Sequence, residues 1–400
     1  MRPFDGRRVL LGVTGGIASY KSAWLARLLA LDGAEVDVVM TRAATEFVGP
    51  ITFEALTGRV VHTDLIAAGR ALDHIRLARD AHAVVVAPAT ADFMARAAGG
   101  HADDLLTAVL LATEAPVLVV PAMNDRMWAH PQTRRNVEHL REIGYAVLEP
   151  DTGMLAAGEG SGPGRMPEPE TIFAHVARLL EPGDLAGRRV LVTAGPTREP
   201  VDPVRYLSNR SSGKMGIAIA SAAWRRGAAV TLVAGPLGVP APVGPRLVPV
   251  ETTEEMARAV ADALRDADVL VMASAPADFR AAAPAADKIK KASAPSSLAL
   301  APTTDILGET RGARRPGAVV VGFALETTDA LRSGRGKLEA KGLDLVVVND
   351  ATEPGAGFAV DTNRVTLIGR DGAERPLPLL PKTEVADAIL DRVTELLDGR

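Results

Sequence analysis

The sequence predicts an α/β fold with two Rossmann-like domains, and three observations lead to this prediction. The chain has 400 residues, 47% of them hydrophobic, which is more than one ordinary core organises. Aromatic residues make up only 4%, and the abundant Ala, Val and Leu favour helices packed on a sheet over a β-sandwich. The pentapeptide Gly-Arg-Arg-Val-Leu occurs at residues 6–10 and again at residues 187–191, each time at the start of an apolar run.

Each copy of the pentapeptide begins the same succession of elements. The apolar run ends in a glycine-rich turn, at residues 14–16 in the first copy and at residue 195 in the second. A helical pattern and another strand follow, over residues 36–40 and 230–233. This alternation is typical of the start of a doubly wound α/β unit.

A second pair of similar segments supports the duplication. Residues 83–88 resemble residues 269–276, and both are apolar runs of the kind found in buried parallel strands. The polar breaker stretch Glu-Pro-Gly-Asp at residues 181–184 separates the two halves. We therefore expect one domain over residues 1–183 and another over residues 184–400.

Two further segments are expected to be loops. Residues 158–166 contain too many glycines for a helix or a strand. Residues 284–304 mix Pro, Ala and Ser around a lysine cluster and have no periodicity. Loops of this length in compact domains are usually lids or binding loops.

Composition excludes several classes of function. The net charge of −4 provides no basic surface for nucleic acid, and no apolar run reaches the length that spans a bilayer. The absence of cysteine excludes disulfides and thiolate metal sites. With no signal-peptide pattern at its start, the chain is expected to be cytoplasmic.

The first turn has the character of a phosphate site. Residues 12–21 form a strand–turn–helix junction in which Gly15 and Gly16 permit close backbone approach, and Ser19 opens the helix. Thr41 ends the next strand and offers a hydroxyl to the same phosphate. The segment matches neither the dinucleotide pattern nor the Walker pattern, so a plain tight turn remains an alternative.

Sharper motifs follow in the first domain. Asp-His-Ile stands at residues 73–75, Ala-Pro-Ala-Thr-Ala-Asp at 87–92, and Pro-Ala-Met-Asn-Asp-Arg-Met-Trp at 121–128, before Gly-Pro-Gly-Arg-Met at 162–166. In these residues the chain resembles the flavin-containing cysteine decarboxylase family over residues 5–180. The resemblance implies FMN as cofactor, in an oligomer whose flavin sites lie between subunits.

The resemblance also assigns roles. His74 matches the catalytic histidine that assists thiol oxidation, although a structural histidine remains the alternative. Asn124 matches the residue that holds the substrate carboxylate. The residues expected to bind FMN are Gly15, Gly16, Ser19, Thr41 and Thr90, and those expected to bind substrate are Asn124 and Met127.

One position departs from the family pattern. The family's flap carries a cysteine that protonates the enethiolate product, and Ala157 stands in its place. Alanine donates no proton, so Glu159 on the same flap and ordered water are the candidate donors. The alternative is that the first domain is a flavin-binding oligomerisation scaffold with impaired decarboxylation.

The second domain resembles a different family. Residues 211–214, near the end of the segment 194–216, are Ser-Ser-Gly-Lys, but the first glycine that a P-loop needs upstream of Gly213 is absent. The segment resembles the motif of the CTP-dependent phosphopantothenate–cysteine ligase family, and the resemblance extends over residues 185–395. Further matching segments lie at residues 277–279, 288–291, 322–327, 337–344 and 348–350.

This second resemblance implies CTP as co-substrate and Mg²⁺ as metal, since the triphosphate charge must be neutralised. Lys288 is the matched catalytic lysine, with a solvated charge run as the alternative. Asn209 and Arg205 are expected to hold the acyl group, with Asn209 also catalytic. Asp278 is the expected metal-linked residue. The residues expected to bind the nucleotide are Ser212, Asp278, Lys288, Asp305, Phe323, Lys337 and Lys341.

Together the two resemblances imply two steps of coenzyme A biosynthesis in one chain. The expected substrates are 4′-phosphopantothenate, cysteine and CTP, and the expected product is 4′-phosphopantetheine. The expected assembly is a homo-oligomer in which decarboxylase trimers are joined through ligase dimers.

Overall fold

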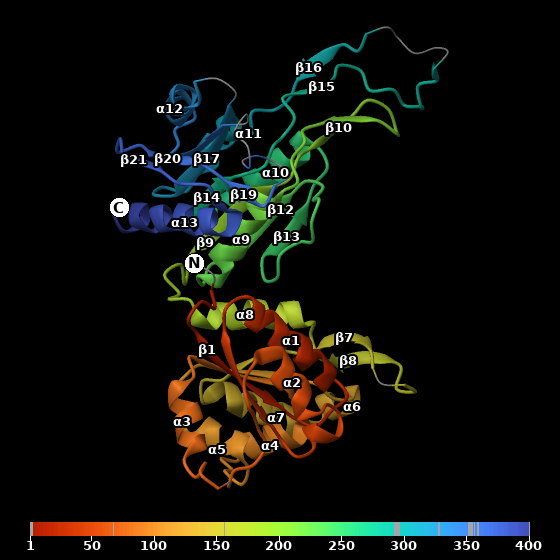
Figure 1. Ribbon diagram of the computed structural model, residues 1–400. Coiled ribbons are helices and arrows are strands. Elements are labelled where there is room, and N and C mark those ends of the chain that lie inside the picture. Colours follow the sequence, from red (N-terminus) through yellow and green to blue (C-terminus); the bar gives the residue numbers. More distant parts are fainter. Residues whose placement is uncertain are drawn as a thin grey trace. The chain divides into compact units, whose positions relative to one another are not determined.

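A computed structural model describes residues 3–66, 68–155, 157–291, 297–326, 329–350, 355, 357 and 360–399, with only the backbone of Glu326 and Asp350. The chain divides into two compact units, Met1–Glu181 and Pro182–Arg400 (Figure 1). Both units are α/β, as the sequence predicts. Within the described residues, no helix has the length and apolar character needed to cross a membrane.

Unit 1 contains a six-stranded parallel sheet with the strand order β3-β2-β1-β4-β5-β6. The strand order reverses between β1 and β4, and in open α/β sheets ligands bind at such a switch point. The strands are β1 (Arg8–Val13), β2 (Glu35–Met40), β3 (Val61–His62), β4 (Ala83–Ala89), β5 (Val117–Pro121) and β6 (Ala146–Val147).

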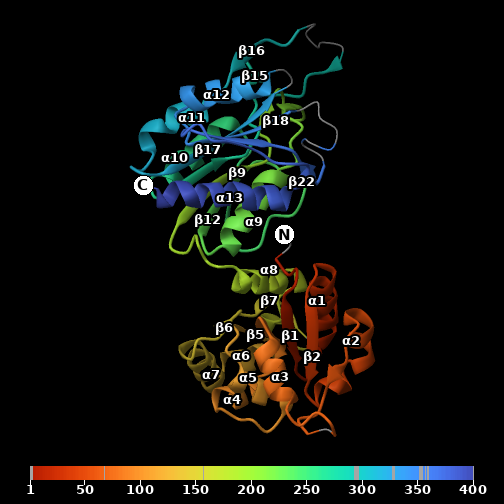
Figure 2. The same cartoon turned by 60° about the vertical axis from the view of Figure 1, so that its left-hand side comes forward.

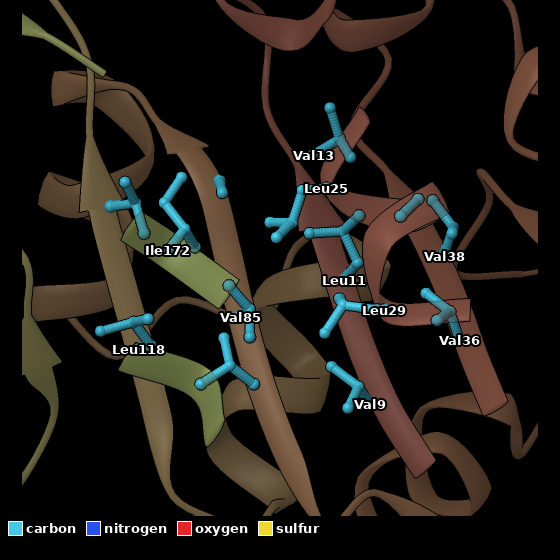
Figure 3. Close-up of a cluster of buried hydrophobic side chains, with 14 of the residues drawn as sticks. Val9, Leu11, Val13, Leu25, Leu29, Val36, Val38, Val85, Leu118 and Ile172 are labelled. Carbon is cyan, nitrogen blue, oxygen red and sulfur yellow. The ribbon is translucent and has the colours of Figure 1, made fainter. Parts of the chain in front are cut away.

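Helices cover both faces of this sheet. The helices are α1 (Ser19–Leu31), α2 (Pro50–Thr57), α3 (Asp73–Asp80), α4 (Ala91–Ala98), α5 (Leu105–Ala112), α6 (Asp125–Ala129), α7 (Pro131–Glu142) and α8 (Pro169–Leu180), with a short 3₁₀ turn at Ala44–Glu46. Figure 3 shows Leu25 of α1 and Ile172 of α8 in one buried cluster with strand residues such as Leu11. Neighbouring valines of β4 alternate between the two cores: Val85 belongs to this cluster and Val84 to the one on the opposite face. This is why β4 reads as a continuous apolar run in the sequence.

The glycine-rich segment 158–166 corrects one expectation. Its second half forms β8 (Ser161–Arg165), which pairs antiparallel with β7 (Asp151–Met154). The glycines here allow the backbone of β8 to lie close to the segment 123–125, since a Cβ at Gly164 would lie 2.2 Å from the carbonyl oxygen of Met123. A Cβ at Gly162 would lie 2.9 Å from the Cβ of Asp125. The expectation of a loop was wrong for β8 because it attributed these glycines to flexibility alone.

Unit 2 contains an eight-stranded sheet in the order β13-β12-β9-β14-β17-β18-β20-β21. Its strands are β9 (Arg189–Ala194), β12 (Ala229–Ala234), β13 (Arg246–Pro249), β14 (Val269–Met272), β17 (Val319–Glu326), β18 (Leu345–Asp350), β20 (Thr366–Gly369) and β21 (Glu374–Pro376). The strands from β13 to β18 are parallel, and β20 and β21 add an antiparallel edge.

The helices of unit 2 are α9 (Lys214–Arg225), α10 (Thr253–Leu264), α11 (Ile306–Glu309), α12 (Ala330–Ala340) and α13 (Lys382–Asp398), with a 3₁₀ turn at Thr310–Ala313. Helices α9 and α13 pack against each other (Figure 2). The buried residues of α10, α11 and α12 form a common core with the sheet.

Two short hairpins project from the sheet of unit 2 as one arm (Figure 1). One pairs β10 (Arg198–Pro200) with β11 (Tyr206–Ser208), and the other pairs β15 (Phe279–Ala281) with β16 (Leu300–Pro302). The two hairpins contact each other. A separate pair joins β19 (Thr362–Asn363) to β22 (Leu380–Pro381).

The expected loop 284–304 is therefore corrected at its end, where β16 completes a hairpin. The sequence lacks a signal for β16 because a strand of three residues is too short for periodicity. Residues 292–296 of this expected loop, Thr327 of the segment 322–327 and Ala156 of the flap lie outside the described residues.

Candidate functional site

The turn between β1 and α1 is held by two hydroxyl groups. Thr14 Oγ1 donates to the carbonyl of Pro88 at 2.8 Å and accepts from the backbone N–H of Thr90 at 3.1 Å. Ser19 Oγ donates to the carbonyls of Thr14 and Gly16 at 3.0 and 2.6 Å. The bonds of Thr14 connect the carboxyl ends of β1 and β4, which are the two strands at the switch point, and those of Ser19 close the turn itself.

A cavity of about 420 Å³ opens at this position. Six of the predicted residues line it: Gly15, Gly16, Thr90, Asn124, Met127 and Glu159. The β1–α1 turn, the start of α6 and the β7–β8 flap thus meet at one cavity, although they are far apart in the sequence.

Other predicted residues of unit 1 lie elsewhere. Ser19 is fully buried and uses its hydroxyl to close the turn. Thr41 lies outside the cavity, where its Oγ1 accepts from the N–H of Ala44 at 3.3 Å. Ala157 is exposed and also outside the cavity.

His74 lies at the first turn of α3, outside the cavity of its own chain. Its Nδ1 is buried, and among the described residues it has no hydrogen-bond partner. The neighbouring Asp73 accepts from His62 Nδ1 at 3.2 Å and contacts Arg76 at 3.3 Å. Burial lowers the pKa of His62 although Asp73 opposes this. His62 is thus a buried histidine whose ring contacts the carboxylate of Asp73.

Asn124 caps the short helix α6. Its Oδ1 accepts from the N–H of Arg126 at 2.9 Å, so the amide is oriented by its own helix. With the oxygen used in this way, the NH₂ group is the part of the side chain that can donate to a carboxylate.

Sequence reasoning missed two features of this cavity. Lys21 lines it while 7% exposed, and its ammonium donates to the carbonyl of Met166 at 2.9 Å and to Glu168 at 3.1 Å. Tyr20 also lines it. The signal available was their place in the first turn of α1, where helix N-terminal residues face a bound anion.

In unit 2, a cavity of about 320 Å³ lies at the carboxyl ends of β14 and β17. Five of the predicted nucleotide-binding residues line it: Asp278, Asp305, Phe323, Lys337 and Lys341. Lys337 donates to the carbonyl of Phe323 at 2.6 Å. Lys341 forms an ion pair with Asp305.

Asp305 also caps α11 by accepting from the N–H of Gly308 at 3.2 Å. Desolvation opposes its ionisation, but the bonds from Lys341 and Gly308 outweigh this and lower the pKa of Asp305. The carboxylate is therefore charged at neutral pH, which matters for a site expected to receive a triphosphate.

Asn209 adjoins this cavity. Its Nδ2 donates to the carbonyls of Ala275 and Pro276 at 3.2 and 2.9 Å, and Pro276 lines the cavity. Ser212 lies in the turn before α9, where its carbonyl accepts from Gly238 at 3.1 Å, outside the cavity lining.

Arg205 and Lys288 lie outside the cavity, on neighbouring backbone segments. Arg205 contacts Asp202 at 3.3 Å, and Ile289, next to Lys288, donates its N–H to the same carboxylate at 3.2 Å. Asp202 received no role from sequence reasoning. The sequence feature that could have identified Asp202 is the Asp-Pro-Val-Arg pattern, in which the Asp side chain accepts from the backbone N–H groups two and three residues ahead.

Within the described ranges, no group of three or more His, Cys, Asp or Glu side chains is arranged to hold a metal ion. Asp278 and Asp305 nevertheless line one cavity. An ion there would take most of its ligands from phosphate oxygens and water, as Mg²⁺ does in nucleotide sites.

Comparison with known proteins gives matches over both units. A family model described as "Flavoprotein" matches residues 2–181, and one described as "DNA/pantothenate metabolism flavoprotein C-terminal domain" matches residues 185–397. Three similar proteins are named "Coenzyme A biosynthesis bifunctional protein CoaBC". The one from Mycobacterium tuberculosis H37Rv is 48% identical and covers 98% of this chain and 97% of its own.

The proteins of that name from Vibrio cholerae and Bacillus subtilis are each 43% identical to this chain. The matches cover 99% and 98% of this chain, and 100% and 98% of the relatives. Similarity at this level extends through both units and covers 97 to 100% of the length of these relatives. The chain therefore belongs to the family of coenzyme A biosynthesis bifunctional proteins, CoaBC.

Proposed function

We propose that this chain catalyses two consecutive steps of coenzyme A biosynthesis. Unit 2 joins cysteine to 4′-phosphopantothenate at the expense of CTP, and unit 1 decarboxylates the product to 4′-phosphopantetheine with FMN. The observation that carries the proposal is that residues predicted from separate sequence motifs line a common cavity in each unit. The proposed compartment is the cytoplasm, where CTP and cysteine are available.

The cavity of unit 1 fits a flavin phosphate and ring. It lies at the switch point of the sheet, beside the N-terminus of α1, a helix of 13 residues whose free N–H groups attract a phosphate. A Cβ at Gly16 would meet no atom closer than 3.9 Å, so the space beside this glycine is open. When bound there, the flavin would oxidise the substrate thiol and so provide the electron sink that decarboxylation requires.

The chain's own residues would hold the substrate at that cavity. Asn124 would donate its NH₂ to the substrate carboxylate, since its oxygen is committed to capping α6. Met127 would contact the apolar part of the substrate. Glu159 lines the same cavity, which supports it as the group that returns a proton to the product.

The position of His74 supports assembly of the decarboxylase from several copies. His74 lies outside its own cavity, and its chain neighbours Leu72 and Ile75 have exposed apolar side chains. Beside the cavity, α1 carries a second exposed apolar group, Tyr20 and Trp24. Two different apolar surfaces on one unit suit a head-to-tail ring, in which His74 of one copy meets the cavity of the next. A trimer is the proposed ring.

The arm of unit 2 supports dimers of the ligase. Its hairpins carry the exposed side chains Val204, Tyr206, Phe279 and Leu300. Such apolar residues on a projecting hairpin are suited to burial against a second copy. Ligase dimers would then connect the trimers.

In the proposed ligation, the carboxylate of phosphopantothenate attacks the α-phosphorus of CTP and pyrophosphate leaves. The cysteine amine then attacks the acyl-cytidylate and CMP leaves. Lys337 and Lys341 would neutralise phosphate charge, and Asp278 would bind the Mg²⁺ that accompanies it. Phe323 would pack on the nucleotide, while Asn209 and Arg205 hold the acyl group and Lys288 stabilises the departing pyrophosphate.

A second candidate is an active ligase joined to a flavin-binding scaffold, and Ala157 is the observation that favours it. A scaffold has no need of Asn124 and Glu159 at the flavin cavity, so we prefer the enzyme.

Pyrophosphate release tests the ligase half of the proposal. With phosphopantothenate and Mg²⁺ but no cysteine, CTP should yield pyrophosphate and an acyl-cytidylate detectable by mass spectrometry. Added cysteine should convert this intermediate to phosphopantothenoylcysteine. Absence of CTP-dependent pyrophosphate with the substrates present would contradict the proposed ligase.

A further inference from the structure

Asp202 is a buried carboxylate whose two oxygens accept hydrogen bonds from two segments of unit 2. It is 3% exposed, and its Oδ1 accepts from the backbone N–H groups of Val204 and Arg205, each at 2.8 Å. Its Oδ2 contacts Arg205 Nη1 at 3.3 Å and accepts from the backbone N–H of Ile289 at 3.2 Å. One side chain therefore links the turn that carries Arg205 to the loop that carries Lys288.

A second bond holds the same loop. The N–H of Ala285 donates to the carbonyl of Val201 at 2.9 Å. Ala285 and Ile289 flank residues 286–288, so the loop is bonded on both sides of this short stretch. Lys288 is itself exposed, and its backbone is fixed by neighbours that contact the segment 201–205.

The bonding pattern requires an ionised carboxylate. Burial opposes the charge on Asp202, but the N–H groups of Val204, Ile289 and Arg205 and the Arg205 guanidinium outweigh it and lower the pKa of Asp202. An ionised carboxylate only accepts, which matches four donor contacts and no acceptor.

We infer that Asp202 is a positioning residue for the ligase reaction, which holds Arg205 and the Lys288 loop in a fixed relation. The inference rests on the proposed function, because it takes Arg205 as an acyl-group contact and Lys288 as the catalytic lysine. Loss of the carboxylate should free the loop and misplace Lys288 relative to the departing pyrophosphate. Asp202 acts through these neighbours and need not touch a substrate.

Asp202→Asn is the discriminating variant. It preserves shape and one acceptor, but its NH₂ would face the N–H of Ile289 or the Arg205 guanidinium, and two donors repel. The kcat for CTP-dependent pyrophosphate release should fall at least about tenfold. The KM for phosphopantothenate should rise through Arg205, while the KM for CTP changes little. Asp287→Asn removes an exposed carboxylate from the same loop and should leave all three constants unchanged.

A double-mutant cycle separates positioning from a general structural effect. If Asp202 acts on kcat through Lys288, then Asp202→Asn should lower kcat less than about twofold in a Lys288→Gln background, because the lysine that Asp202 positions is already absent. Multiplicative losses in the double variant would overturn the inference. Full activity of Asp202→Asn beside an inactive Lys288→Gln would overturn it as well, and would leave the proposed function standing. Full activity of Lys288→Gln would instead contradict the role proposed for Lys288.

Hydrogen exchange on the unmodified protein gives a readout that needs no variant. A peptide over residues 284–291 should exchange its amide hydrogens more slowly than an unstructured peptide, since Ala285 and Ile289 are bonded. In a folded Asp202→Asn protein this peptide should exchange faster while peptides from β9 are unchanged. Complete exchange of the wild-type peptide at the earliest time point would show that the loop is not held, and would overturn the inference.

Discussion

Lys341 is paired with Asp305 at the wall of the unit 2 cavity, so two residues expected to contact the nucleotide also contact each other. The pair has a consequence for CTP binding. A triphosphate must draw Lys341 toward itself, and Asp305 then remains as a nearby negative charge unless Mg²⁺ or another cation compensates it.

Lys341→Gln should therefore impair CTP binding more than Asp305→Asn does. The first change removes a cation and leaves Asp305 uncompensated, whereas the second removes a charge that repels phosphate. We expect the KM for CTP to rise about tenfold or more in Lys341→Gln, which corresponds to about 1.4 kcal/mol. Steady-state kinetics at saturating phosphopantothenate and cysteine measure this. The double variant with Lys341→Gln and Asp305→Asn should have a lower KM for CTP than Lys341→Gln alone. A higher KM in the double variant would argue against repulsion between Asp305 and the phosphates.

The adjacent glycines of the first turn should respond differently to the same substitution. A Cβ at Gly15 would lie 2.4 Å from Ala43 Cβ and 2.9 Å from its carbonyl carbon, so Gly15→Ala should lower the melting temperature of unit 1. A Cβ at Gly16 meets open space, so Gly16→Ala should fold normally but intrude on the flavin. We expect normal melting of the flavin-free protein and FMN binding weakened about tenfold, or 1.4 kcal/mol. Thermal melting and flavin titration of the two variants measure these effects. Wild-type FMN affinity in a folded Gly16→Ala protein would exclude the flavin from the space beside Gly16.

Ala157 should make the final protonation slow. Ala157→Cys should accelerate formation of the decarboxylated product, because a thiol then stands at the flap position that carries the family's donor. Glu159→Gln should slow it if the carboxyl at the cavity is the substitute donor. Stopped-flow recovery of flavin absorbance with phosphopantothenoylcysteine, together with the product mass, measures both effects. Unchanged recovery in Glu159→Gln would leave water or another side chain as the donor.

Lys382 should make the stability of unit 2 rise at alkaline pH. Burial, with a further contribution from Lys214, lowers the pKa of Lys382 to about 8, whereas the unfolded chain has the ordinary value of 10.5. Between these values the unfolded state binds more protons, so the free energy of unfolding increases with pH. The carbonyls of Gly357 and Val360 accept from its ammonium at 2.8 and 2.5 Å, but they do not reverse the effect of burial.

The comparison is with Lys382→Met, which cannot titrate. Between pH 7.5 and 9.5 the wild type should gain up to about 2 kcal/mol of unfolding free energy relative to this variant. Urea denaturation at the two pH values measures the difference. A difference that is constant with pH would mean that Lys382 keeps its ordinary pKa in the folded protein.

The sequence predicted the fold class because the strands of both sheets are buried on two faces. Val84 and Val85 belong to opposite cores, so β4 appears as an uninterrupted apolar run that is easily recognised. Short or glycine-rich strands gave no such signal. β8 was missed because the space requirement of Gly164, set by the carbonyl of Met123, is a tertiary contact that no local pattern contains.

The candidate sites were predictable where motif residues lie at the carboxyl ends of neighbouring strands. Gly16 and Thr90 meet at one cavity for this reason. His74 and Lys288 do not line the cavities of the same chain, so the proposed function brings them to substrate through assembly and through the position of the loop, which no local sequence pattern contains. The bond between Asp202 and Ile289 joins residues far apart in the sequence, so only the folded structure brings it to notice.

In the proposed function one chain performs both steps, and mass spectrometry of a single reaction is the experiment that tests this. The purified protein is incubated with 4′-phosphopantothenate, cysteine, CTP and Mg²⁺, without added enzymes, after reconstitution with FMN. We predict CTP-dependent formation of 4′-phosphopantetheine, with phosphopantothenoylcysteine as a transient species. A reaction that stops at phosphopantothenoylcysteine, with CTP consumed and flavin bound, would contradict decarboxylation by unit 1 and favour the scaffold.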